Sequence, residues 1–182
     1  MFHRSTQGDY RSARTEYSEC LRDRCEDYAD RFGVEFHAGE KPWGRVKADV
    51  YMPCATQNEI GLEDAKRMIE EGTSKLLIEV ANMPTKAEAV EELQKAGFMI
   101  APSKAVNAGG VAVSALEMSQ NAMKLSWTEE EVDEKLKKIM KNIFNNIDSA
   151  AKKYGMDGNL IAGANIAGFL KVAEAMLDEG IF

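Results

Sequence analysis

Histidine, cysteine and long apolar runs are scarce in this chain, and each scarcity argues against a class of site. The 182 residues include two histidines and three cysteines. The cysteines, Cys20, Cys25 and Cys54, are odd in number and lack the spacing of zinc ligands. We therefore predict no metal site, and reduced thiols of the kind typical of a cytoplasmic protein.

Two further absences concern membranes and nucleic acids. No apolar run approaches the roughly 18 residues that span a bilayer, and the N-terminus lacks the apolar core of a secretory signal. Basic residues number 23 against 30 acidic ones, so the net charge is −7 and the pI is about 5.0. We expect neither a membrane nor a nucleic-acid partner, because a nucleic-acid partner requires a basic face.

The chain does contain enough apolar material for a core. Hydrophobic residues make up 45% of it and charged residues 29%, which is ordinary for a globular protein. A length of 182 residues predicts one domain, or one domain and a piece.

Strand and helix patterns alternate through the middle of the chain. We predict strands at residues 48–52, 75–80 and 98–101, with helices at 63–71 and 86–95 between them. Repeated strand–helix–strand units of this length imply a parallel sheet with helices on its faces. The expected fold class is therefore α/β.

The N-terminal part is harder to interpret. Residues 1–16 are polar, Arg-rich and without a clear period, and we treat them as a leader. A helix is predicted over residues 16–32, ended by Gly33, and a short strand over residues 34–37.

The last third is predicted to be all-helical. Helices are expected over residues 111–124, then from an N-cap at Ser126 or Thr128 to Gly155, then over residues 159–177. In the second of these, apolar residues at helical spacing predict a core stripe: Val132, Leu136, Ile139, Met140, Ile143 and Ile147. In the third, four small residues suit close packing on a neighbour: Gly163, Ala164, Ala167 and Gly168.

Three polar loops each follow a predicted strand. They are residues 53–58, 81–85 and 102–110. Ligands of open α/β sheets bind at the carboxyl ends of the strands. The sequence therefore predicts a ligand site where these three loops lie.

The run from Asn107 to Asn121 is the most informative of these segments. Gly109 and Gly110 predict a sharp turn that a ligand can approach closely. The helix that follows would point unpaired N–H groups at an anion, and Ser114 lies about one helical turn further on. The alternative is an ordinary loop with a glycine-rich helix start.

Four segments, taken in order, resemble one enzyme family. They are Pro53-Cys-Ala-Thr-Gln-Asn58, Glu79-Val-Ala-Asn-Met-Pro-Thr85, Pro102-Ser-Lys-Ala-Val-Asn-Ala-Gly-Gly110 and Gly163-Ala-Asn-Ile-Ala-Gly-Phe169. The chain, from about Asp27 to Phe182, resembles the coenzyme domain of the glutamate dehydrogenases, most closely the NADP-dependent bacterial type. The wider family also acts on leucine, phenylalanine and valine.

The resemblance implies a fold and an activity. It implies a partial Rossmann-like parallel sheet flanked by helices. The implied enzyme is an oxidoreductase that interconverts L-glutamate with 2-oxoglutarate and ammonia by hydride transfer, in amino-acid metabolism. NADP is the implied coenzyme, with NAD possible, and the parent enzyme would be a homo-hexamer.

The resemblance also assigns substrate roles to two residues. Ser114 matches the serine that binds the side-chain carboxylate of glutamate or 2-oxoglutarate, which suits a hydroxyl donor. Val111 matches the residue beside the aliphatic part of the substrate. A serine on an ordinary helix surface is the alternative for Ser114.

Five further residues match coenzyme contacts of the family. Ala55, Thr56 and Gln57 match the loop along the nicotinamide ribose. Asn82 and Asn107 match the asparagines near the ribose and the carboxamide, groups that an amide can pair with as donor and acceptor. Asparagines that only stabilise turns are the alternative.

Two other residues in these loops receive a plainer interpretation. Lys104 is expected to be an exposed loop lysine. Cys54 has no histidine partner in sequence range, so a buried thiol is expected there rather than a nucleophile.

The chain contains no Gly-x-Gly-x-x-Gly, the fingerprint that holds a pyrophosphate on a helix N-terminus. In the glutamate dehydrogenases the fingerprint and the substrate domain, with its catalytic lysine and aspartate, lie upstream. We therefore interpret residues 17–182 as the C-terminal part of a dinucleotide-binding domain that is inactive alone. The alternative is a non-catalytic binding or assembly module whose unpaired sheet edge would associate with other chains.

Overall fold

The computed structural model describes residues 25–180. The expected leader and the first part of the helix expected over residues 16–32 lie outside this range. The described part of that helix is α2 (Cys25–Phe32), and Gly33 follows it with a φ of 61°.

The strand expected at residues 34–37 is wrong. In the described part of the chain, these residues form no strand, and Phe36 is exposed. A segment of four residues with an alternating pattern forms a strand only where the backbone of a second strand lies beside it and hydrogen-bonds to it.

A short parallel sheet lies at the centre of the middle segment. β1 (Leu76–Ile78) pairs with β2 (Met99–Ala101), with Leu77 opposite Ile100. The expected strand at residues 48–52 is reduced to one bridge, in which Tyr51 pairs with Leu77. Pro53 has no N–H to continue that ladder, which limits the pairing to this bridge.

Two helices contribute buried residues to the core around this sheet, which also contacts α8 (Leu160–Glu179) through β2. They are α3 (Leu62–Glu71) and α4 (Ala87–Lys95), which pack against each other. The core is made of their buried residues together with those of the strands and the preceding loop: Trp43, Tyr51, Ile60, Ala65, Met68, Leu77, Ala89, Leu93, Phe98 and Ile100. The expected α/β class, a parallel sheet with flanking helices, is confirmed.

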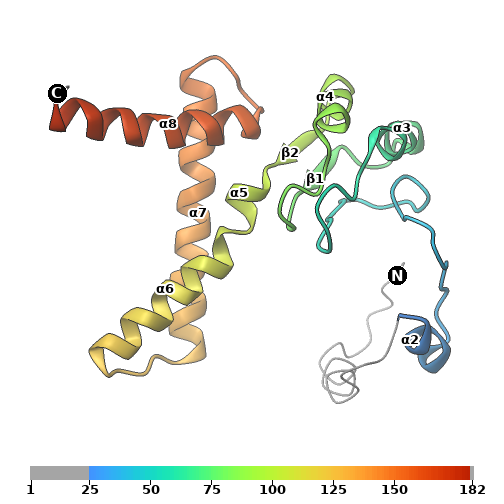
Figure 1. Cartoon of the computed structure of the whole chain (residues 1–182), viewed down its shortest axis with the longest axis horizontal. Coiled ribbons are helices and arrows are strands. Elements are labelled where there is room, and N and C mark those ends of the chain that lie inside the picture. Colours follow the sequence, from blue (N-terminus) through green and yellow to red (C-terminus); the bar gives the residue numbers. More distant parts are fainter. Residues whose placement is uncertain (1–24, 181–182) are drawn as a thin grey trace.

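The last third is helical, as expected. It comprises α5 (Ser103–Val106), α6 (Ala108–Met123), α7 (Glu129–Lys153) and α8 (Leu160–Glu179). Thr128 is the N-cap of α7, and its hydroxyl accepts a hydrogen bond from the Glu131 backbone N–H in a capping box. Figure 1 shows α6 beside the N-terminal half of α7, and α8 crossing the C-terminal end of α7.

The apolar stripe of α7 is not the closed core that its spacing predicts. Ile147 is buried, but the other five members of the stripe are only half-buried. The described neighbours of α7 are α5, α6 and α8, and these cover the stripe in part. Helical spacing identifies the face that makes contacts, but how deeply the face is buried depends on which elements cover it.

The contact between α7 and α8 depends on Gly163. A Cβ at this position would lie 2.3 Å from the backbone oxygen of Ile147, so the two helices approach each other over a bare backbone. Gly168, which was expected to serve the same purpose, is exposed, and a Cβ there would meet nothing within 4 Å. The packing expectation is therefore confirmed at Gly163 and wrong at Gly168.

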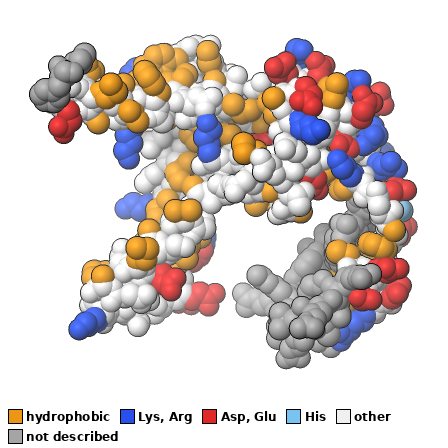
Figure 2. All heavy atoms as spheres, in the orientation of Figure 1, with side chains coloured by type: hydrophobic (Ala, Val, Ile, Leu, Met, Phe, Trp, Pro, Cys, Tyr) orange, Lys and Arg blue, Asp and Glu red, His pale blue; other side chains and the backbone are white. Residues whose placement is uncertain are grey.

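The outer half of α8 carries exposed apolar side chains. Phe169 is 70% exposed and Leu177 is 77% exposed, and Figure 2 shows apolar side chains gathered along this helix. Among residues 25–180, α8 alone is long and apolar enough to span a membrane, by length and composition, with a mean hydropathy of 1.5. Its apolar run is interrupted by Asn165, Lys171 and Glu174, which is why the sequence pattern did not indicate it.

Candidate functional site

The three segments predicted as polar loops meet around one open pocket of about 720 Å³. The loop predicted at residues 102–110 is wrong for most of its length, because α5 and the first turn of α6 occupy it and leave only Asn107 between them. The three segments lie at the carboxyl end of β1 and β2, as parallel pairing requires. The pocket is lined by Cys54, Ala55, Gln57, Val80, Ala81, Asn82, Asn107, Gly110, Val111 and Ser114. Six of the seven residues named from the family resemblance therefore line one pocket, and Thr56 is the exception.

Backbone hydrogen bonds hold the first two loops together. The backbone N–H groups of Val80 and Ala81 both donate to the Pro53 carbonyl, at 3.2 and 2.9 Å. The Asn58 N–H donates to the Met83 carbonyl at 2.9 Å. Asn58 and Met83 both have positive φ, at 57° and 44°, so each loop turns sharply beside this bond.

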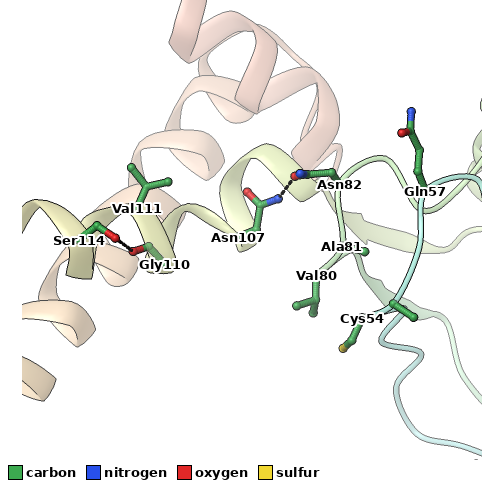
Figure 3. A pocket seen from close by; sticks show the side chains of 10 residues that line it. Cys54, Gln57, Val80, Ala81, Asn82, Asn107, Gly110, Val111 and Ser114 are labelled. Carbon is green, nitrogen blue, oxygen red and sulfur yellow. Dashed lines mark hydrogen bonds between the residues drawn. The ribbon is translucent and has the colours of Figure 1, made fainter. Parts of the chain in front are cut away.

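A direct side-chain bond joins the second loop to the third. Asn107 Nδ2 donates to Asn82 Oδ1 at 2.5 Å, as Figure 3 shows. Asn107 lies between α5 and α6, and its side chain makes no capping bond to α6. The two amides hold separate loops together, so turn stabilisation alone does not describe them.

The glycine-rich turn expected before α6 is wrong. Gly109 and Gly110 lie in the first turn of α6 itself, and neither has a positive φ. A Cβ on Gly109 would lie 3.4 Å from Met140 Sδ and 3.5 Å from Leu136 Cδ1, so this glycine fits beside α7. These are ordinary van der Waals distances, and a Cβ on Gly110 would meet nothing within 4 Å, so neither a turn nor close helix packing requires glycine at these two positions.

The substrate candidates lie on the exposed face of α6. Ser114 is exposed, and its hydroxyl donates to the Gly110 carbonyl at 3.2 Å. Val111 is 74% exposed and lines the same pocket one turn earlier. Both side chains are therefore accessible to a small ligand in the pocket.

Three further residues, in or near the pocket, can be compared with what the sequence predicted for them. Cys54 is exposed and lines the pocket, so the expected buried thiol is wrong. Thr56 does not line it, and its backbone N–H faces Glu59 Oε2 at 3.4 Å. Lys104 is exposed, as expected, but it lies on α5 and its ammonium donates to Asn165 Oδ1 on α8.

Sequence reasoning did not name Val80 and Ala81 as site residues, although they line the pocket. Both are apolar, so composition gave no reason to single them out. Their position was the available signal, because they directly follow β1 and precede Asn82.

The chemistry of this pocket is neutral. Its lining residues carry no charged side chain, and its polar groups are amides, a hydroxyl and a thiol. The amides and the hydroxyl donate and accept hydrogen bonds but do not exchange protons near neutral pH. The pocket can therefore bind and orient a polar ligand, whereas acid–base chemistry requires groups beyond these lining residues.

Comparison with known proteins identifies the family. The family model for Glutamate/Leucine/Phenylalanine/Valine dehydrogenase matches residues 13–180. The chain belongs to this family.

Named relatives narrow the resemblance to glutamate dehydrogenases. The NAD-specific glutamate dehydrogenase of Clostridium symbiosum is 56% identical over 161 residues, covering 88% of this chain and 35% of the relative. The NADP-specific glutamate dehydrogenase of Haemophilus influenzae is 50% identical over 166 residues, covering 88% of this chain and 36% of the relative. A solved glutamate dehydrogenase superimposes with a TM-score of 0.86 at 53% identity, over 93% of this chain and 38% of the other.

These comparisons also set the scale of the chain. It spans a little more than a third of the length of the relatives it matches. The match covers nearly all of the described residues, so the fold described above corresponds to a part of those longer proteins.

Proposed function

We propose that the pocket binds the nicotinamide and ribose end of a dinucleotide coenzyme. The observation that carries this proposal is the convergence of three loops: Ala55 and Gln57, Asn82, and Asn107 line one pocket at the carboxyl end of the sheet. Amide side chains offer both a donor and an acceptor, which suits a carboxamide and ribose hydroxyls. Thr56 belongs to the same loop as Ala55 and Gln57, and its proposed place beside the ribose comes from the family resemblance alone, because it does not line the pocket.

The proposed substrate is glutamate or 2-oxoglutarate. Ser114 would donate its hydroxyl to the side-chain carboxylate, and Val111 would lie against the aliphatic part. A leucine, valine or phenylalanine dehydrogenase is the alternative within the family. The glutamate dehydrogenase names of the relatives and the hydroxyl of Ser114 in the pocket support glutamate.

The proposed reaction is the reductive amination carried out by a glutamate dehydrogenase of which this chain forms a part. Ammonia and one proton convert the keto carbon of 2-oxoglutarate into an iminium carbon, and water leaves. The reduced nicotinamide supplies the hydride for that carbon, which gives L-glutamate. The residues of this pocket bind and orient the two ligands, because their polar groups donate and accept hydrogen bonds.

We expect the isolated chain to be inactive. Its sequence has no pyrophosphate fingerprint, and no carboxylate, imidazole or ammonium group lines the pocket. The measurement is NADPH oxidation by the purified 182-residue chain with 2-oxoglutarate and ammonium. Clear turnover would refute this expectation.

The coenzyme is proposed to be NADP, with NAD as the alternative. Relatives from Haemophilus influenzae and Escherichia coli are NADP-specific, whereas the Clostridium symbiosum relative is NAD-specific. The ribose phosphate that distinguishes the two coenzymes is usually read after the second strand of the nucleotide fold. Parallel titrations with NADPH and NADH decide between them.

A binding titration tests the site. The fluorescence of a reduced nicotinamide nucleotide is followed as protein is added, for the unaltered chain and for Asn107→Ala. We expect the substitution to weaken binding about tenfold, because the amide contact to the ligand is lost. Asn121→Ala, an exposed asparagine further along α6, is the control and should leave binding unchanged. Equal binding by all three proteins would refute the proposed site.

The competing proposal is a non-catalytic module that pairs with another polypeptide. The exposed apolar side chains of α6 and α8 favour it. For the enzyme of which the chain would form a part, a homo-hexamer in the cytoplasm is proposed from the family resemblance alone. Absence of nucleotide binding together with stable association would support the module over the enzyme part.

A further inference from the structure

A buried carboxylate lies directly behind the proposed coenzyme pocket. Glu79 follows β1, and its side chain is 6% exposed. Successive residues of an extended chain point to opposite sides, so Val80 lines the pocket and Glu79 lines a smaller hollow of about 320 Å³ behind it. The proposed function gives Glu79 no task.

Glu79 bonds to the third loop through Ser103. Its Oε2 accepts a hydrogen bond from the Ser103 backbone N–H at 3.1 Å. A carboxylate acceptor makes this bond stronger than one between neutral groups, and its burial limits competition from water.

Ser103 passes the connection on in two directions. Its carbonyl accepts a hydrogen bond from the Asn107 backbone N–H at 2.9 Å. Its hydroxyl accepts one from the Met83 N–H at 3.4 Å. The same residue therefore contacts the segment that carries Asn107 and the loop that carries Asn82.

Together these hydrogen bonds form a closed circuit that joins the segment after β1 to α5 and Asn107. Asn107 Nδ2 bonds to Asn82 Oδ1 at 2.5 Å, and Asn82 lies three residues after Glu79. The Asn82–Asn107 bond lies at the exposed side of this circuit, where water competes for both amides. The bond from Glu79 to Ser103 lies at its buried side, so it is the connection best able to hold the two loops in register.

We propose that Glu79 is a positioning residue, which fixes Asn82 and Asn107 for the nicotinamide ribose by holding Ser103. The proposal rests on the proposed function. Glu79 acts from behind the pocket and does not contact the ligand.

Substitutions at Ser103 isolate the contact. Ser103→Pro removes the N–H that Glu79 accepts, yet proline suits the first position of a helix. Pro102 before it has a ψ of 145°, which a following proline tolerates. Ser103→Ala is the matched control, because it removes the hydroxyl and keeps the N–H.

Substitutions at Glu79 test the same hydrogen bond at its acceptor. Glu79→Ala removes the acceptor, and Glu79→Gln keeps an acceptor oxygen and should restore most of the function. Glu91→Ala is the control for charge, since Glu91 lines the same hollow from α4.

The first measurement is made without ligand. Side-chain amide signals of Asn82 and Asn107 in ¹H–¹⁵N spectra report whether the two amides keep their bond. We expect these signals to shift and broaden in Ser103→Pro and Glu79→Ala. They should stay in place in Glu79→Gln and Glu91→Ala. Ser103→Ala loses only the bond from the Met83 N–H, so it should shift these signals less than Ser103→Pro does. Unchanged signals in Ser103→Pro would overturn the proposal even where Glu79→Ala fails to fold.

The second measurement adds reduced nicotinamide mononucleotide as the probe. We expect Ser103→Pro and Glu79→Ala to bind it about tenfold more weakly, and Glu79→Gln and Glu91→Ala to bind it within about twofold of the unaltered chain. Ser103→Ala should bind it more tightly than Ser103→Pro does. Equal affinity in all variants would overturn the role of Glu79 while leaving the proposed function intact. No binding by the unaltered chain would refute the proposed function and, with it, the role of Glu79 in binding. The ligand-free signals would still show whether the bond from Glu79 to Ser103 positions Asn82 and Asn107.

Discussion

Individual residues of the proposed site can be tested against neighbours of the same chemistry. Ser114 and Ser119 both lie on α6, and each hydroxyl donates to the carbonyl four residues earlier, at 3.2 and 2.8 Å. Ser114 lines the pocket and Ser119 does not. The pair therefore separates a role in ligand binding from a role in the helix.

We predict that Ser114→Ala weakens the binding of 2-oxoglutarate about tenfold, because a hydrogen bond to a carboxylate is lost. Ser119→Ala should leave the affinity unchanged. Ligand titration followed by NMR measures both dissociation constants. Equal affinities for the two variants would show that Ser114 has no contact with the substrate.

Tyr51 makes the stability of the core sensitive to alkaline pH. Burial, and then the hydrogen bond and negative charge of Glu71, raise the pKa of Tyr51 to about 12 from its ordinary value of 10. The hydroxyl donates to Glu71 Oε2 at 3.1 Å. The neutral phenol is favoured by folding, so its stabilising effect is complete below pH 10 and is lost as the pH rises through about 12.

We predict that Tyr51→Phe costs about 1 kcal/mol of unfolding free energy at neutral pH, because the bond to Glu71 is lost. The gap to the unaltered chain should narrow between pH 10 and 12, since phenylalanine at this position has no phenol to lose a proton. Urea unfolding at several pH values measures this gap. A constant gap across that range would contradict the assigned cause.

At the scale of elements, α7 and α8 meet over the backbone of Gly163. Gly168 lies on the same helix, is exposed and has free space around it. Adding one methyl group at each position therefore produces opposite effects.

We predict that Gly163→Ala destabilises the fold by about 2 kcal/mol or more, because its Cβ would press on the Ile147 carbonyl. Gly168→Ala should stabilise it by about 0.5–1 kcal/mol, the ordinary gain of alanine over glycine within a helix. Thermal and urea unfolding measure both. If Gly163→Ala were neutral, the helices would not be in the close contact described.

Helices were predictable from this sequence to within a few residues. The expected ranges 63–71 and 86–95 correspond to Leu62–Glu71 and Ala87–Lys95, because glycine and charge patterns near a helix end are local signals. Strands were overestimated, since the ranges 75–80 and 98–101 became Leu76–Ile78 and Met99–Ala101. The length of a strand depends on its partner strand, which local sequence does not contain.

The site was predictable to the same extent, and for the same reason. Parallel topology placed three loops at one edge, and the pocket brings them together. The bond between Asn82 and Asn107 and the buried contact of Glu79 with Ser103 depend on how the loops fold over each other. Spacing along the chain carries no information about such contacts.

The whole molecule combines a small core with much exposed apolar surface. The core cluster surrounds the sheet, whereas α6 and α8 expose Val111, Met118, Phe169 and Leu177, each at least 70% exposed. An apolar surface of this kind in water favours association.

We predict that the purified chain self-associates, with a mass by light scattering that rises with concentration. Replacing Phe169 and Leu177 by serine should lower the average mass, because both side chains lie on the exposed half of α8. Lys171→Ser on the same helix is the control. A monomer at all concentrations would count against the assembly-module alternative.

The location of the nicotinamide within the chain tests the central claim most directly. Intermolecular nuclear Overhauser effects between the ring protons of reduced nicotinamide mononucleotide and protein methyl groups give this location. We predict contacts to Ala55, Val80 and Val111, which line the pocket between the three loops. Contacts instead to Val90, which lines the hollow behind Glu79, would contradict the claim, and so would the absence of any contact.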